Sequence, residues 1–319
     1  VSFATRRSPV RSRPGPPLKM NYIIFAGLAL LASAANTIFN RISANRIGTL
    51  VSAVLKAFFI VLCILAVSAI LGHVPQLYSM SKEQWLWMGV LGLVTVADWI
   101  FYFLSIKRAH LEAFAPFEAA SVLFLSNLLF SIFMFSTVTK GGTLINTVLF
   151  FLGLVALVGA MLFAVLNKKI NPSTKKIWVL YAFMSALAMG FTLIITKTKL
   201  QGIEPDVIAF HQMFIVLIVC TVIMFISKSY KELKVVKVKD YAKFFIAAIF
   251  NALLIFLRYK AILCEGSNPA IINCIISFDF VLVSLATVLF FKANNKKELI
   301  VLILIVTVGM ALNVISGMV

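Results

Sequence analysis

Long apolar runs, separated by short charged turns, divide the chain into ten segments. A helix needs about 20 residues to cross the roughly 30 Å hydrocarbon core of a bilayer, so each run is long enough for one crossing. The predicted spans are residues 21–40, 48–71, 85–105, 112–136, 144–167, 177–197, 206–227, 241–261, 267–291 and 298–318. The pattern therefore predicts an all-α integral membrane protein with ten transmembrane helices.

The ten spans form two sets of five at a constant offset of 156 residues. Spans one to five fall on spans six to ten without a gap, and so do the charged turns between them. We interpret residues 20–168 and 176–319 as two five-helix repeats. Because five is odd, the second repeat enters the membrane from the opposite side. Inverted repeats of this kind are typical of secondary transporters.

Composition agrees with a membrane protein. Hydrophobic residues make up 62% of the chain and charged residues 13%, whereas about a quarter of the residues in soluble domains are charged. The net charge of +18 lies mainly in the turns and in the amino-terminal leader, and no nucleic-acid-binding module is recognisable, so we expect no nucleic-acid partner. The four cysteines lack CxxC spacing and are interpreted as packing residues, so we expect no metal site and no cofactor.

Residues 1–19 contain four arginines and four prolines but no apolar run. We predict that they form a disordered basic leader that is not native, with Met20 as the true start. The stretch that ends at Ala34 also resembles a cleavable signal peptide. Its place as the first span of the repeat argues against cleavage.

Lys and Arg are distributed unevenly between the two sets of loops. The loops after odd-numbered spans hold 17 of them, and the loops on the opposite side hold six. The positive-inside rule therefore places the odd-numbered loops in the cytoplasm and both termini outside. We expect a multi-pass protein of the cell (inner) membrane, with the lipid bilayer as its surroundings.

Polar residues within the spans are the candidate functional residues, because a charge at the bilayer centre costs at least about 3 kcal/mol unless it has a partner or a cavity. In span one, Asn36 and Asn40 lie on one helical face, and the repeat places Thr192 and Thr196 at the equivalent depth in span six. We predict a shared cavity between spans one, four, six and nine. The predicted substrate-binding or cavity residues are Asn36, Asn40, Lys56, Asp98, Glu118, Ser121, Thr192, Thr196, His211, Gln212, Asn251, Asn273 and Ser277.

Glu118 is the deepest acid in the first repeat and is the predicted proton-coupling residue. The alternative role is a static ion pair with Lys56. We interpret Arg258 as an anchor that reaches the membrane interface. We interpret Asp279 as a structural residue, because on a continuous helix it faces away from the polar stripe of span nine.

A known family resembles this arrangement. The segment Tyr259–Ile262 (YKAI), followed by a turn at Pro269, and the two five-helix halves are similar to the EamA family of the drug/metabolite transporter superfamily, ten-helix type. The likeness covers residues 20 to 319. It implies a transporter of a small molecule without naming the substrate, and the ten-helix members resemble the reverse orientation of the termini.

The residues and the resemblance together predict a secondary active transporter, an exporter or exchanger of a small metabolite or drug, that works by alternating access. Proton coupling is one option for its energy source, because no GxxxxGK[ST] motif for nucleotide binding is present. No HExxH motif or nucleophile with a nearby base is present, so we expect no enzyme. The alternatives are a channel or a non-transporting membrane subunit and, with less support, an intramembrane enzyme. Homodimer formation stays open.

Overall fold

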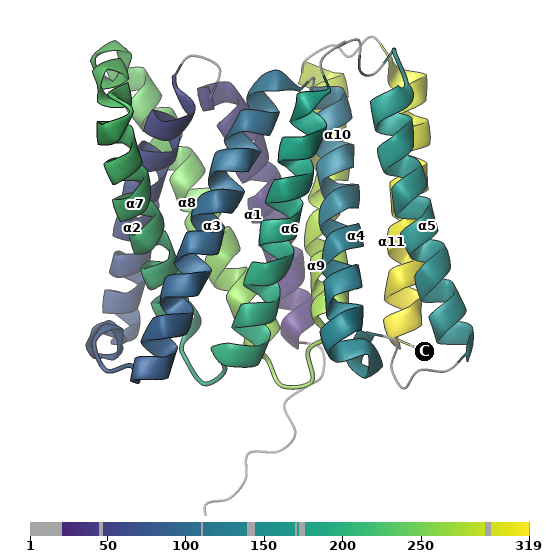
Figure 1. Cartoon of the computed structure of the whole chain (residues 1–319), viewed down its shortest axis with the longest axis horizontal. Coiled ribbons are helices and arrows are strands. Elements are labelled where there is room, and N and C mark those ends of the chain that lie inside the picture. Colours follow the sequence, from purple (N-terminus) through teal and green to yellow (C-terminus); the bar gives the residue numbers. More distant parts are fainter. Residues whose placement is uncertain are drawn as a thin grey trace, which may run out of the picture.

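A computed structural model describes residues 21–44, 47–109, 111–138, 144–169, 171, 176–290 and 295–318. The predicted leader, residues 1–19, lies outside this part of the chain. Figure 1 shows the helices packed side by side, with their axes along one common direction. Every regular element in the described ranges is helical.

The long helices agree with the predicted spans. Their bounds are α1 (Asn21–Ala44), α2 (Thr49–Leu71), α3 (Lys82–Arg108), α4 (Leu111–Val138), α5 (Leu144–Leu166), α6 (Ile177–Lys199), α7 (Pro205–Ile226), α8 (Val238–Leu263), α9 (Pro269–Ser277), α10 (Asp279–Phe290) and α11 (Lys296–Met318). Two short 3₁₀ helices are η1 (Val74–Leu77) and η2 (Ser229–Val235). Within the described residues, nine helices are long and apolar enough to cross a membrane, and α9 with α10 forms a shorter apolar stretch. The all-α membrane fold is therefore confirmed.

The ninth predicted span differs from the prediction of one uninterrupted helix. It is divided into α9 and α10 at Phe278. The Phe278 N–H donates to the Ile275 carbonyl at 3.2 Å, and the Val281 N–H donates to the Phe278 carbonyl at 3.1 Å. Such bonds between residues three apart are tighter than those of an α-helix and rotate the chain that follows. By contrast, α4 continues through Pro116.

Helix neighbours are exchanged consistently between the two halves. The offset of 156 relates α1, α2, α3 and α5 to α6, α7, α8 and α11, and it relates α4 to α9–α10. The contact of α1 with α8 then corresponds to the contact of α6 with α3, and both contacts are extensive. The pairs α2–α7 and α5–α11 correspond to themselves. This is the pattern that a two-fold relation between inverted repeats produces.

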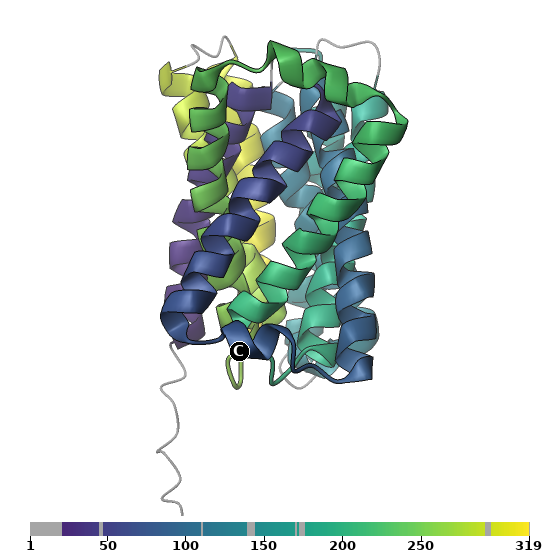
Figure 2. The same cartoon turned by 90° about the vertical axis from the view of Figure 1, so that its left-hand side faces the viewer.

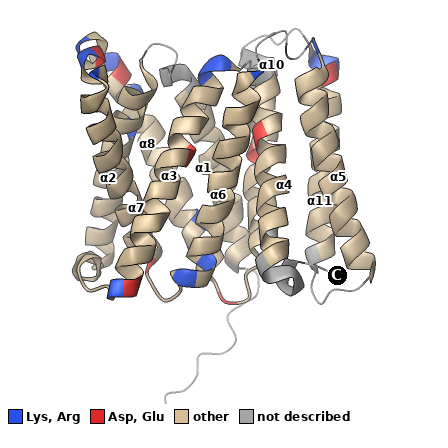
Figure 3. Ribbon diagram, viewed as in Figure 1, with Lys and Arg blue, Asp and Glu red and all other residues tan. Residues whose placement is uncertain are grey.

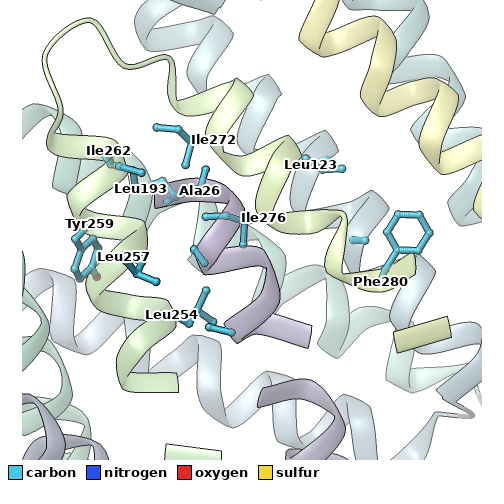
Figure 4. Packing of buried hydrophobic residues seen from close by; sticks show 14 of the residues in the cluster. Ala26, Leu123, Leu193, Leu254, Leu257, Tyr259, Ile262, Ile272, Ile276 and Phe280 are labelled. Atoms are coloured by element: carbon cyan, nitrogen blue, oxygen red, sulfur yellow. The ribbon is translucent and has the colours of Figure 1, made fainter. Parts of the chain in front are cut away.

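Small and branched apolar residues fill the interface between the halves. Figure 4 shows Leu254 and Leu257 of α8 near Ala26 of α1 and Ile276 of α9, with Phe280 beyond the interruption. All five side chains are buried. Around the outside, by contrast, many large apolar side chains are exposed, as expected for a surface in contact with lipid.

Most charged residues lie at the two ends of the bundle, as Figure 3 shows, and Lys and Arg are more frequent at its upper end. Figure 2 shows η2 at this end, where it connects α7 with α8. At the same end, Lys169 Nζ donates a hydrogen bond of 2.7 Å to the Glu298 carboxylate, and this bond raises the pKa of Lys169. A few acidic residues lie within the bundle instead, and they belong to the site described next.

Candidate functional site

A cavity of about 150 Å³ lies inside the bundle. Its lining residues come from α1 to α4 and from α6 to α10, hence from both repeats. One enclosed water needs roughly 10–15 Å³ by this measure, so the cavity has room for about ten waters. That space suits a small solute better than a drug-sized one, whose pockets are about 300–1,000 Å³.

The two repeats contribute corresponding positions to the cavity wall. From α3 it is lined by Thr95, Asp98, Trp99, Tyr102 and Phe103, and from α8 by the residues 156 positions later, Asn251, Leu254, Ile255, Arg258 and Tyr259. The same relation joins three lining positions of α1 to three of α6, and it joins Lys56 to Gln212. The wall is therefore symmetric in position but not in chemistry. Asp98 corresponds to Leu254, and Tyr102 corresponds to Arg258.

Three carboxyl groups line the cavity from three different helices. Asp98 of α3 accepts a hydrogen bond of 2.5 Å from Ser185 Oγ, and Asp279 of α10 accepts one from Ser33 Oγ. Glu118 of α4 is close enough to Asp98 and Asp279 to interact with both electrostatically. Among the described residues, no hydrogen bond or ion pair satisfies the Glu118 side chain.

Two basic side chains complete the charged lining. Lys56 of α2 is buried, donates to Asn36 Oδ1 at 2.8 Å, and has its Nζ 5.1 Å from the centre of the Trp99 ring. Arg258 of α8 donates from Nη2 to Asn273 Oδ1 at 3.4 Å. Its buried Nε has no hydrogen-bond partner in the described structure. The guanidinium therefore has free donor capacity.

Five charged side chains thus share one small cavity: two basic and three acidic. Arg258 interacts electrostatically with Asp98 and Asp279, but no pair of these side chains is within the 4.0 Å of an ion pair. Charges inside a membrane are costly unless they are paired or solvated. The separation of these charges points to groups kept available for a bound solute or proton.

A neutral hydrogen-bonded chain links three helices at the side of the cavity. Tyr259 donates from its hydroxyl to Gln212 Oε1 at 2.6 Å, and Gln212 donates from Nε2 to Thr95 Oγ1 at 2.7 Å. These bonds join α8, α7 and α3. They fix Gln212, the counterpart of Lys56, in one orientation.

Nine of the thirteen residues predicted for the site line this cavity. They are Asn36, Asn40, Lys56, Asp98, Glu118, Thr192, Gln212, Asn251 and Ser277. Their helices lie far apart in the sequence, and the fold brings the residues together.

The other four predicted residues do not line the cavity. Asn273 contacts Arg258, which does, as described above. Ser121 and Thr196 donate to backbone carbonyls of their own helices at 2.9 and 2.8 Å, respectively. The His211 Nδ1 lies 2.9 Å from the Val207 carbonyl oxygen, and its ring meets Trp85 edge-on with centroids 4.8 Å apart.

Two charged residues play a different part from the one predicted. Arg258 was expected to reach the membrane interface, but α8 continues to Leu263 and its side chain lines the cavity. Asp279 was expected to face away from the polar stripe, but the interruption at Phe278 changes the rotation of α10 and brings Asp279 to the wall. An ion pair with Lys56 was the alternative role predicted for Glu118. The described structure contains no such ion pair.

Several cavity residues were not predicted at all. Thr95, Trp99, Tyr102 and Tyr259 line the wall, and Ser185 binds Asp98. The repeat itself could have found Thr95, because it is the counterpart of the predicted Asn251. For the aromatic residues, no signal distinguishes a cavity wall from ordinary packing.

The long apolar helices define a multi-pass membrane protein. Residues 176–315, most of the second repeat, match the EamA-like transporter family, which agrees with the sequence resemblance. One similar solved crystal structure has a TM-score of 0.65 and 15% sequence identity, over 91% of this chain and 95% of that chain. It shows that the likeness in fold includes both repeats. No curated protein matches the sequence. The family match over the second repeat implies a membrane transporter of the drug/metabolite transporter type.

Proposed function

We propose that this protein is a secondary active transporter that binds a small polar solute in the central cavity and moves it by alternating access. The supporting observation is that both repeats line one cavity, and that the cavity holds five charged side chains without an ion pair between them in the described structure. When two halves of inverted topology exchange conformations, a site between them opens first to one side and then to the other.

The arrangement of charges favours a solute that carries both signs. The unpaired Arg258 Nε is a donor suited to a carboxylate, and guanidinium groups bind carboxylates with defined geometry. Glu118 offers an acceptor to an ammonium group. A zwitterion small enough to replace about ten waters satisfies both requirements at once. Trp99 and Tyr102 provide apolar surface for the remainder of such a solute.

Glu118 is the proposed site of proton coupling. Its carboxyl group has no partner among the described residues and lies near two further acids, so a proton relieves the repulsion between them. Substitution Glu118→Gln keeps the shape and fixes the neutral form. We expect it to abolish accumulation driven by a pH gradient while solute exchange at zero gradient continues. An unchanged gradient-driven accumulation contradicts this role.

The binding step can be tested with the tryptophan in the cavity wall. Purified protein is titrated with zwitterionic, anionic, cationic and neutral solutes of similar size while the fluorescence of Trp99 is followed against a Trp99→Phe control. We expect a saturable response to zwitterions that Arg258→Met removes and that Glu83→Gln, at an exposed acid of α3, preserves. The proposal fails if no class of solute binds, or if Arg258→Met binds as the original protein does.

Uptake into proteoliposomes distinguishes a carrier from a channel. A carrier saturates with solute concentration and accumulates solute only with a gradient, whereas a channel only equilibrates it.

We further propose that the end of the bundle that holds η2 faces the cytoplasm, as the charge count indicates. A reporter that is active only in the cytoplasm, fused to the carboxyl terminus, is then expected to be inactive, and activity contradicts the orientation.

A further inference from the structure

A second group of chemically active side chains lies at the lower end of the bundle, outside the cavity. His73 follows α2 in the turn before η1, and Glu204 and Asp206 lie at the start of α7. One ligand atom from each of the three residues lies within 4.8 Å of the others. His73 Nδ1 is 2.9 Å from Asp206 Oδ1. The group therefore connects the first repeat with the second.

Asp206 has the environment of a metal ligand that lacks its ion. Its side chain is 0% exposed, and its second carboxylate oxygen, Oδ2, has no hydrogen-bond partner in the described structure. A buried carboxylate oxygen without a donor is costly. Two carboxylates and one imidazole therefore meet in this group, and one oxygen of the buried carboxylate lacks a donor in the described structure.

The other two ligands are accessible from outside. Glu204 is exposed and occupies the N-cap position of α7, but its side chain makes no capping hydrogen bond. Its carboxylate is therefore available to turn toward Asp206. The His73 side chain is 22% exposed, which leaves a route by which an ion can reach the group from solution.

The backbone on both sides holds the ligands in defined positions. Gly72 ends α2 with a φ of 74°, a left-handed conformation that favours glycine, and the His73 N–H donates to the Ser68 carbonyl at 2.9 Å. Pro205 begins α7 immediately before Asp206. Ligands that are fixed by rigid elements bind a metal ion with little loss of flexibility.

We propose that His73, Glu204 and Asp206 form a binding site for a divalent transition-metal ion, for which Zn²⁺ is the best match. Zinc binds imidazole nitrogen and carboxylate oxygen atoms together, whereas Ca²⁺ and Mg²⁺ prefer oxygen ligands alone. Zinc bonds of about 2.0–2.2 Å in a tetrahedral arrangement place neighbouring ligand atoms roughly 3.4 Å apart. The His73–Asp206 contact opens slightly to admit the ion, and Glu204 moves inward. Water takes the fourth position.

The site connects two helices that pack across the repeats. His73 follows α2 directly and Asp206 belongs to α7, and α2 and α7 are in contact. A bound ion therefore ties together these two helix ends. Because the ligands lie outside the transport cavity, this site does not depend on the identity of the solute.

Calorimetric titration of the full-length protein with Zn²⁺ alone tests the site. The protein carries a purification tag without histidine, and the partly exposed thiols of Cys63 and Cys264 are blocked, because both can bind zinc. We expect one binding event that His73→Gln and Glu204→Gln each weaken at least tenfold. The control Glu83→Gln removes an exposed carboxylate from the same end of the bundle and is expected to bind as the original protein does. Zn²⁺ should also raise the unfolding temperature of the original protein but not that of His73→Gln.

Two results overturn the site. One is the absence of saturable zinc binding, in which case His73 and Asp206 form a simple hydrogen-bonded pair. The other is zinc binding that His73→Gln and Glu204→Gln leave unchanged, which places the ion elsewhere. Asp206→Asn is a third variant, but its buried position makes it a risk to folding. The two solvent-accessible ligands keep the test decisive without it.

Discussion

The cavity and the α5–α11 pair lie in the same bundle but use their polar residues differently. In the pair, the buried Asn313 donates from Nδ2 to the Gly309 carbonyl of its own helix at 2.8 Å, and a Cβ added to Gly153 would lie 2.3 Å from Asn313 Nδ2. Neither helix lines the cavity in the described structure. In the cavity, by contrast, charged groups line open space. A polar residue inside a membrane is thus a packing element in one region and a proposed binding group in the other.

Arg258→Met should have the largest effect, and this effect should fall on solute binding and not on stability. It removes a charge that no ion pair compensates, so we expect loss of solute binding of about 100-fold or more with unchanged or improved thermal stability. Fluorescence titration and thermal unfolding measure the two quantities on the same sample. A variant that loses stability and keeps affinity would show that Arg258 serves packing instead.

Gly153→Ala should have the opposite profile. The added methyl group meets Asn313 and the Gly309 backbone, and overpacking of this kind costs about 1–3 kcal/mol. We expect a lower unfolding temperature with unchanged solute affinity. Gly159→Ala is the matched control on the same helix, because a Cβ there has no neighbour within 4 Å. It should be neutral or stabilising by up to about 1 kcal/mol. Equal destabilisation of both variants contradicts the close approach of α5 and α11.

Lys197→Met tests whether a buried cation outside the cavity affects stability only. Its Nζ donates to the Ile262 carbonyl at 2.9 Å and to Ser267 Oγ at 2.8 Å. Loss of these bonds should reduce stability by about 1–2 kcal/mol and leave solute affinity unchanged. Lys199→Met, at an exposed position on the same helix, provides the control, because it removes a cation that contacts the Trp87 ring at 5.0 Å but makes no buried hydrogen bond in the described structure. Reduced affinity in Lys197→Met only would show that satisfied cations also shape the cavity.

Ser33→Ala should have the smallest effect. Ser33 donates to Asp279 across the cavity, and a hydrogen bond between membrane helices contributes about 0.6 kcal/mol on average. We expect a change of two- to threefold in solute affinity, measured alongside Asp279→Asn and the double variant. Ser131→Ala is the control, because Ser131 donates only to the Leu128 carbonyl of its own helix. Additive effects of Ser33→Ala and Asp279→Asn would show that the two residues act independently.

Hydropathy predicts the helices of this protein well, since lipid imposes both length and apolar character on every crossing. The repeat adds a second constraint, because it shows which faces of distant helices are equivalent. Asn36 and Thr192 could be placed in one cavity on this ground, and Lys56 could be related to Gln212.

The remaining site residues depend on local geometry that the sequence does not mark. No glycine or proline lies at Phe278, where the ninth span is interrupted, so the rotation that brings Asp279 to the cavity could not be anticipated. The depth of Arg258 depends on where α8 ends. His73 and Asp206 are 133 positions apart in different repeats, and only packing brings them into contact.

The interruption at Phe278 has no counterpart in the first repeat, since α4 runs unbroken through the equivalent Val122. The halves therefore differ in backbone geometry as well as in charge. If they exchanged conformations, the outward-facing and inward-facing forms would not be mirror images of equal free energy. The empty protein would then rest with a preference for one side of the membrane, a bias that drives no net transport by itself and that each transport cycle must overcome once.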